Sequence, residues 1–267
     1  MRVFIAGASG AFGSSLLTAL SNAGHTSVTS DADPAHRSSF LSSVAELQAD
    51  AVVNLLGTST ELPAGFRELA PVSRLRIEGS STLIAAARLL GASRYVAASP
   101  FYGYGFGDHG DRPVTETAPF GEANDTRNDP AFRAIRSSEQ QARAFGAIVL
   151  RLGHLYGPNA RVVPPISRRA SGSLPVIHVE DAARAVIRAL DHGTPGAVYN
   201  IAADEPVTWR ALQEEQARSD GFAAPVALAD SVMRAIAPFA SQIICATSLR
   251  LSTDAALRDL DFTAVRR

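Results

Sequence analysis

The spacing of three glycines near the start of the chain, Gly7, Gly10 and Gly13, constrains the fold more than any other feature. They follow an apolar run at residues 3–6 that predicts a strand, and they precede a helical pattern at residues 14–20. A strand, a glycine turn and a helix in this order let backbone N–H groups approach a pyrophosphate closely. The loop residues predicted to bind such a cofactor are Gly7, Ser9, Gly10, Ala11, Phe12 and Gly13.

Strand and helix patterns alternate along the rest of the chain, as in a parallel sheet built from βαβ units. The run at residues 51–56 is largely apolar, as expected for a strand that helices cover on both faces. The predicted fold is an α/β, doubly wound parallel sheet of the Rossmann type. The other expected strands lie at 27–29, 94–98, 147–152 and 198–201, and the helices at 40–47, 72–90, 132–145 and 179–190.

Residues 103–130 interrupt this alternation. The stretch is rich in Gly, Asp, Thr and Pro and has little periodicity. A loop of this length in a compact domain is usually functional, and this one follows a strand end, where doubly wound folds bind ligands. The sequence therefore predicts that this loop borders a binding site.

The chain contains no lysine, because all 25 residues of the combined Lys and Arg count are arginines. This excludes mechanisms that need a lysine Schiff base, a phosphate-loop lysine or a tyrosine assisted by lysine. The formal net charge of −1 gives no electrostatic reason to expect nucleic acid or an anionic membrane as a partner.

The single cysteine, Cys245, cannot form an intrachain disulfide, and its apolar neighbours predict a buried thiol. The six histidines are scattered, so no metal site is predicted. His178 and Asp181 are interpreted as structural residues at a helix start, where Asp181 can bind free N–H groups. The sequence shows no signal peptide and no apolar window of ~18 residues, so the expected location is cytoplasmic.

Six short blocks follow one another in an order that is typical of one family. With them, the chain resembles the extended and atypical short-chain dehydrogenases/reductases of the NAD-dependent epimerase/dehydratase type, from residue 1 to about residue 215. The blocks are Val-Phe-Ile-Ala-Gly at 3–7, Arg-Ile-Glu-Gly-Ser at 76–80, Arg-Tyr-Val-Ala-Ala-Ser at 94–99, Leu-Arg-Leu-Gly-His-Leu-Tyr-Gly-Pro at 150–158, His-Val-Glu-Asp at 178–181 and Val-Tyr-Asn-Ile-Ala at 198–202.

This resemblance implies a Rossmann domain that binds NAD(P) and a small C-terminal lobe that binds a small-molecule substrate. The Rossmann domain would comprise residues 1–155 and 176–203, and the lobe residues 156–175 and 204–267. Relatives often pair through two helices, so a homodimer would involve the expected helices at 72–90 and 132–145.

The chain departs from the family at the Tyr-x-x-x-Lys pair, in which the tyrosine is the general acid/base. The best register places Phe132 at the tyrosine and Arg136 at the lysine, and a shift of one residue gives Ala131 and Ile135. Neither register supplies a phenol or an ammonium group. Arg136 can donate a hydrogen bond to a cofactor ribose, but it stays protonated and cannot relay protons. The helix asparagine of many relatives is replaced by Arg76.

Four other residues are candidates for the catalytic role, each with a structural alternative. Ser99 can donate a hydrogen bond to a substrate carbonyl, or satisfy local backbone. Tyr102 and Tyr104 can act as acids at the mouth of the site, or serve as packing aromatics. His154 can shuttle protons if its pKa stays near neutral, or it can be a core histidine.

The remaining cofactor contacts are predicted beyond two strand ends. Asp31 lies about 20 residues after the glycines, where an acidic side chain binds ribose hydroxyls, which favours NAD over NADP. Arg37 lies close enough to favour the opposite preference. Leu56, at the end of the apolar run at 51–56, and Gly57, directly after it, complete the predicted cofactor site. The stretch between Gly24 and Ala51 is short for the family, which leaves open whether cofactor is bound.

Three functions follow from these observations. The first is an atypical NAD(P)-dependent enzyme that acts on a sugar-like or polyketide-like molecule with non-standard acid/base residues. The second is an enzyme that uses the same cleft for non-redox cyclisation, dehydration or isomerisation. The third is a non-catalytic dinucleotide-sensing protein.

Overall fold

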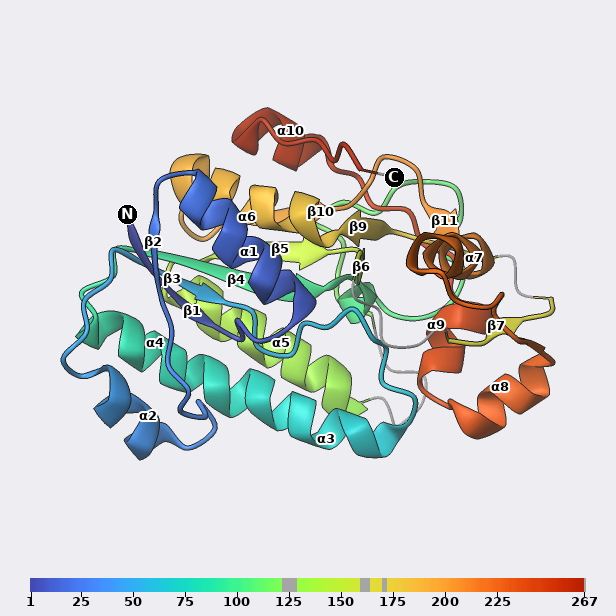
Figure 1. The fold of residues 1–267 in the computed structure, drawn as a ribbon, viewed down its shortest axis with the longest axis horizontal. Coiled ribbons are helices and arrows are strands. Elements are labelled where there is room, and N and C mark those ends of the chain that lie inside the picture. The colour runs from blue at the N-terminus through green and yellow to red at the C-terminus, as the bar shows by residue number, and fades with distance from the viewer. Residues whose placement is uncertain (122–128, 159–163, 170–171, 267) are drawn as a thin grey trace.

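The computed structural model describes residues 1–121, 129–158, 164–169 and 172–266. Six parallel strands form the central sheet in the order β10-β5-β4-β3-β1-β2 (Figure 1). Because β1 pairs with β2 on one side and β3 on the other, the strand order reverses at β1, as doubly wound sheets require. This confirms the predicted α/β fold. The strands are β1 (Arg2–Ala6), β2 (Thr26–Val28), β3 (Ala51–Asn54), β4 (Arg94–Pro100), β5 (Ile148–Leu152) and β10 (Val198–Ile201).

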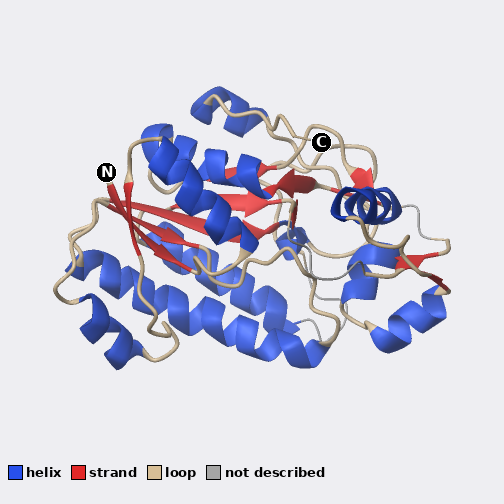
Figure 2. Ribbon diagram, in the orientation of Figure 1, coloured by secondary structure: helices blue, strands red, loops and turns tan. Residues whose placement is uncertain are grey.

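Helices cover both faces of the sheet (Figure 2). Strand β1 shows why the sequence requires this, because its successive side chains point to opposite faces and those of residues 3–6 are all apolar and buried. Val3 and Ile5 pack in one core with side chains of α1 and α6, whereas Phe4 packs in a second core with side chains of α2 and α4. The helices are α1 (Ala11–Asn22), α2 (Arg37–Val44), α4 (Ser80–Leu89), α5 (Asp129–Ala144) and α6 (Val179–His192).

The helix expected at residues 72–90 begins earlier and changes its winding. Helix α3 spans Phe66–Arg74, a π-helical turn covers Leu75–Gly79, and α4 continues from Ser80. The predicted start at residue 72 is therefore six residues late, and α3 runs through Pro71, which lacks a backbone N–H. The π turn carries Arg76, and such turns are frequent at functional sites.

A smaller group of elements lies beyond the carboxyl ends of the strands and has its own apolar core (Figure 1). Two short links, β6 (His154–Tyr156) and β9 (Val176–His178), pair with each other and join this region to the sheet. Cys245 in this region is half-buried, and not fully buried as its apolar neighbours predict. The region contains η2 (Phe101–Tyr104), β7 (Ile166–Ser167), β8 (Ser173–Leu174), β11 (Val207–Thr208), α7 (Trp209–Asp220), β12 (Ala227–Leu228), α8 (Asp230–Ile236) and α9 (Ala240–Ala246).

The end of the chain does not stay in this region, although residues 204–267 were expected there. Helix α10 (Asp254–Leu260) packs against α6 and β10 of the sheet. Beyond it, the Asp181 carboxylate accepts hydrogen bonds from the backbone N–H groups of Val265 and Arg266, at 3.0 and 2.8 Å. Asp181 therefore binds N–H groups of the C-terminal segment. The prediction that it binds N–H groups of its own helix is wrong. Over the described residues, no helix has the length and apolarity to cross a membrane.

Candidate active site

The glycine loop, residues 7–13, joins β1 to α1 as predicted. Gly7 has φ +86°, a conformation that side chains disfavour, so the turn itself requires glycine. A Cβ atom on Gly13 would lie 2.4 Å from the carbonyl oxygen of Ala8, so the loop packs tightly against the start of the helix. A Cβ atom on Gly10 would meet nothing within 4 Å, so this glycine faces open space.

This loop suits the pyrophosphate of a dinucleotide. Gly10 is the N-cap of α1 and offers no side chain, and the first helical hydrogen bond runs from Ser14 N–H to Gly10 O at 2.9 Å. The N–H groups of Ala11, Phe12 and Gly13 therefore have no helical partner and point out of the positive end of the helix dipole. Phe12 is buried in the core, so it can offer only its backbone.

The other predicted cofactor residues lie beyond the neighbouring strand ends. Asp31 is exposed three residues after β2, and Leu56 and Gly57 follow β3. Ser9 is exposed in the glycine loop. These positions surround the carboxyl ends of β1, β2 and β3, so the residues present fit a nicotinamide dinucleotide.

Arg136 lies apart from them. Its side chain is exposed, and its guanidinium stands 6.0 Å from the centre of the Phe120 ring. Phe132, at the position of the family tyrosine, is buried against Phe106 with ring centres 5.2 Å apart. In the alternative register Ala131 and Ile135 are buried and apolar. A phenol is therefore missing from α5 in either register.

Arg76 occupies the centre of the site. It is 4% exposed, and its Nη2 donates to Gly57 O at 2.7 Å and to the Tyr102 hydroxyl at 3.1 Å. Its Nη1 is buried and has no partner among the described residues. The sequence pointed to this residue only as the replacement of an asparagine, because its partners are distant along the chain.

Tyr102 lines a cavity of about 130 Å³, here called the inner cavity, with Gly57, Arg76, Ser99 and His154 among the other lining residues. Gly57, Tyr102 and His154 follow the carboxyl ends of β3, β4 and β5, where the fold places ligands. Since Arg76 donates to the phenol oxygen, the Tyr102 proton remains available to a group in the cavity.

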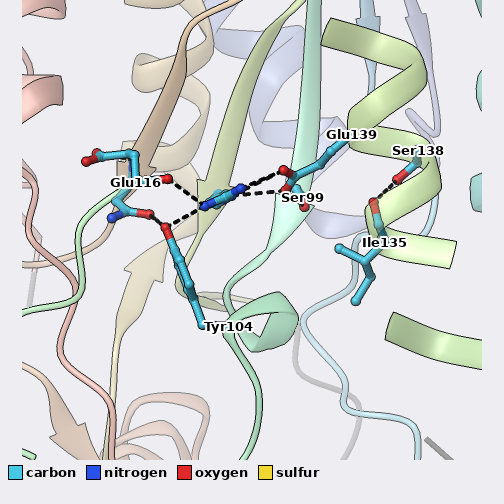
Figure 3. A network of polar contacts seen from close by, with 8 residues as sticks. Ser99, Tyr104, Glu116, Ile135, Ser138 and Glu139 are labelled. Carbon is cyan, nitrogen blue, oxygen red and sulfur yellow. Dashed lines mark hydrogen bonds and ion pairs between the residues drawn. The ribbon is translucent and has the colours of Figure 1, made fainter. Parts of the chain in front are cut away.

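Ser99 and Tyr104 belong instead to a buried ion-pair network (Figure 3). Arg151 and Glu139 form a bidentate pair, with Nη2 to Oε2 at 2.8 Å and Nε to Oε1 at 3.1 Å. Ser99 donates to Glu139 Oε1 at 2.5 Å, and the Tyr104 hydroxyl accepts from Arg151 at 2.9 Å. Tyr104 in turn donates to Asn200 Oδ1 at 2.6 Å.

In this network, both hydroxyl protons already have acceptors inside the protein. Burial also raises the pKa of the Tyr104 phenol above its ordinary value, which disfavours its ionisation. The catalytic roles of Ser99 and Tyr104 therefore remain predictions. Glu139 and Arg151 were absent from the predicted site, because their pairing depends on the packing of α5 against β5.

His154 is buried between the inner cavity and a second cavity of about 200 Å³, here called the outer cavity. Its ring packs edge-to-face on Trp209, with ring centres 5.3 Å apart. Burial lowers the pKa of His154 to about 4, so the imidazole is neutral at pH 7. The expected near-neutral pKa, and with it the proton shuttle, is therefore not supported. Among the described residues, no cluster of His, Cys, Asp and Glu could hold a metal ion.

Acidification from pH 7 to pH 5 is expected to remove about 2 kcal/mol of unfolding free energy through His154 alone. The unfolded chain binds a proton there below about pH 6.5, whereas the folded chain does so only near its pKa of about 4. The contribution is complete above the unfolded pKa and is lost as the pH falls toward 4. Denaturant titrations at both pH values would compare the wild type with His154→Phe, which keeps an aromatic ring against Trp209. Equal losses in the two proteins would contradict the prediction.

Comparisons with known proteins agree with this arrangement. A profile of the NAD dependent epimerase/dehydratase family matches residues 3–202. A 3-diazoavenalumate denitrifying reductase from a Streptomyces species is 30% identical over 259 residues, covering 84% of this chain and 83% of the relative. The solved structure of a dTDP-glucose 4,6-dehydratase from Streptomyces venezuelae with NAD bound has a TM-score of 0.77 at 17% identity, covering 100% of this chain and 93% of that chain.

A UDP-glucose 4-epimerase from Thermotoga maritima, solved with UDP-glucose, has the same TM-score of 0.77 at 18% identity and covers 100% of this chain and 94% of that chain. These two structures share the fold, and the family profile covers the glycine loop, the inner cavity and the ion-pair network. The chain therefore belongs to the NAD dependent epimerase/dehydratase family.

Proposed function

We propose that the protein is a nicotinamide-dependent reductase of a small, elongated and largely apolar molecule. In this proposal, Tyr102 held by Arg76 takes the place of the missing tyrosine–lysine pair. One observation carries it: the Tyr102 hydroxyl accepts from Arg76 at 3.1 Å and lines the inner cavity beside Gly57 and His154. The resemblance to a reductase at 30% identity supports the reaction class.

The chemistry of Tyr102 follows from its partner. A bound reduced nicotinamide would supply a hydride to a substrate carbon. Tyr102 would donate its phenolic proton to the substrate oxygen that gains charge, and solvent would return a proton to Tyr102 afterwards. The positive charge of the Arg76 guanidinium stabilises the negative charge left on the phenol oxygen. Arg76 therefore positions and polarises Tyr102 but does not transfer a proton in the reaction.

The lining of both cavities supports an apolar substrate over a nucleotide sugar. Among their described residues, Arg76 is the one cationic side chain, and it lies in the inner cavity. A nucleoside diphosphate would need cations or free backbone N–H groups around its phosphates. The outer cavity instead presents apolar groups such as Leu212, Met233 and Ile244, together with the carboxylate of Glu61. A polyketide-like molecule fits this chemistry.

A second candidate reaction is the reductive removal of dinitrogen from a diazo-bearing carbon. A hydride forms the new C–H bond while the C–N bond breaks, and its electron pair leaves with N₂. When that carbon carries a cationic aryl diazonium group, hydride and cation give a neutral arene and N₂, so no oxygen gains charge and the substrate needs no proton donor. The absence of the tyrosine–lysine pair and the name of the 30% identical reductase favour this candidate.

Tyr102→Phe distinguishes the two reactions. With an aryl-conjugated ketone as substrate, we expect turnover to fall about a hundredfold, because general-acid catalysis contributes at least that factor. With a benzenediazonium salt, which carries no oxygen, we expect little change. The loss of NADPH or NADH absorbance would measure both rates, and cofactor titration would show intact binding.

Tyr95→Phe is the matched control. It removes the same hydroxyl from a buried tyrosine of β4, the strand that leads into η2, and Tyr95 does not line either cavity. Its turnover of both substrates should equal that of the wild type. If wild-type protein reduces the ketone and Tyr102→Phe does so equally fast, the role given to Tyr102 is wrong.

A further inference from the structure

The outer cavity adjoins the inner one, because the two share Glu61, Leu62, His154 and Leu155 as lining residues. A single elongated molecule that extends past these residues would occupy both. The outer cavity has a volume of about 200 Å³. An apolar cavity of about 150 Å³ is known to bind benzene, so this volume suits one aromatic ring. The ring of Trp209 forms part of its wall.

Gln213 on α7 places an unsatisfied amide oxygen at this cavity. Its side chain is 5% exposed, and its Oε1 is buried without a hydrogen-bond partner among the described residues. Its neighbours along the same helix are satisfied. Gln216 donates to Gly157 O at 3.1 Å and to Asp220, and Trp209 Nε1 donates to Pro165 O at 3.2 Å.

Such a group is costly unless something binds it. A buried acceptor without a donor loses its hydrogen bond to water and gains nothing in return. The packing of α7 does not require a glutamine here, because the adjacent lining residues Leu212 and Met233 are apolar. The amide is therefore explained by a ligand that supplies a donor.

We propose that Gln213 Oε1 accepts a hydrogen bond from a hydroxyl group on an aromatic ring seated in the outer cavity. A hydroxyl fits because it is a neutral donor, whereas a carboxylate would meet no cation among the described residues that line this cavity. This inference rests on the proposed function: the substrate is then a hydroxylated aromatic molecule whose reactive group extends to Tyr102.

The test uses ring-sized probes and needs neither cofactor nor turnover. Trp209 is the only tryptophan of the chain and lines the cavity, so its emission reports occupancy. The probes are 4-ethylphenol and ethylbenzene, which differ by one hydroxyl. In Gln213→Leu, we expect the affinity ratio of 4-ethylphenol to ethylbenzene to fall about tenfold from its wild-type value, as loss of one buried hydrogen bond implies.

Gln216→Leu is the matched control, since it makes the same substitution at a satisfied amide of the same helix. Its affinity ratio should stay at the wild-type value. An unchanged ratio in Gln213→Leu, or an equal fall in both variants, would overturn the assignment. Failure of the reductase assay with intact hydroxyl discrimination would instead contradict the proposed function alone.

Thermal unfolding of the unliganded protein gives an independent readout. If Gln213 serves a ligand, Gln213→Leu removes an unsatisfied buried group and should raise the melting temperature. A lowered melting temperature would show that the amide supports the fold itself, and would overturn the inference whatever the probes show.

Discussion

Replacement of Gly10 by valine is expected to abolish binding of NADH and NADPH while the protein stays folded. Gly10 has an extended backbone, with φ −88° and ψ 174°, which valine adopts without strain. A Cβ atom there meets no atom of the protein within 4 Å, so the new side chain projects into the space in front of helix α1. That space is where the pyrophosphate must approach the free N–H groups. Titration of nicotinamide fluorescence would measure the loss.

The same substitution at Gly13 provides the contrast. A Cβ atom there would lie 2.4 Å from Ala8 O, so Gly13→Val should disrupt the packing of the loop and lower the melting temperature. Gly10→Val should melt as the wild type does. Retained cofactor affinity in a folded Gly10→Val protein would show that the glycine loop does not bind dinucleotide.

Loss of the Arg151 guanidinium is expected to lower the free energy of unfolding by about 3–5 kcal/mol, the usual result of leaving a buried charge unpaired. Glu139 is 3% exposed and would lose a bidentate partner. Tyr104 and the carbonyl oxygen of Glu116 would also lose their donor. Denaturant unfolding of Arg151→Leu at pH 7 measures the effect.

Two further variants test whether the loss of stability comes from the unpaired buried charge. Arg151→Leu combined with Glu139→Leu should recover part of the loss, because no unpaired charge remains. Arg74→Leu removes one side of the Arg74–Glu78 ion pair, whose side chains are 61% and 48% exposed, and should leave the free energy of unfolding nearly unchanged. Similar losses in Arg151→Leu and Arg74→Leu would show that burial adds nothing to the Arg151–Glu139 pair.

The elements that the sequence predicted well are those with a local signal. The glycine loop was placed because turn, strand and helix are contiguous, and β10 was predicted at its observed bounds. The π turn around Arg76 was missed because one wider helical turn barely changes the spacing of apolar residues along the helix. The extension of α3 through Pro71 was missed because proline usually disfavours the interior of a helix.

The candidate site was predicted less completely, because its contacts join residues that are distant along the chain. Tyr102 was a candidate, but its partner Arg76 lies 26 residues earlier. Gln213 gave no signal, since an unsatisfied amide can be recognised only once its surroundings are known. The pKa of His154 likewise depends on burial, which the block at 150–158 does not reveal.

The return of the chain to the sheet after the lobe limits how the lobe can move. The lobe is joined to the sheet through β6 and β9 on one side, and through α10 and the segment clamped by Asp181 on the other. A body tethered at two separate places cannot swing freely about one hinge. Any rigid-body displacement of the lobe relative to the sheet must therefore preserve both attachments at once.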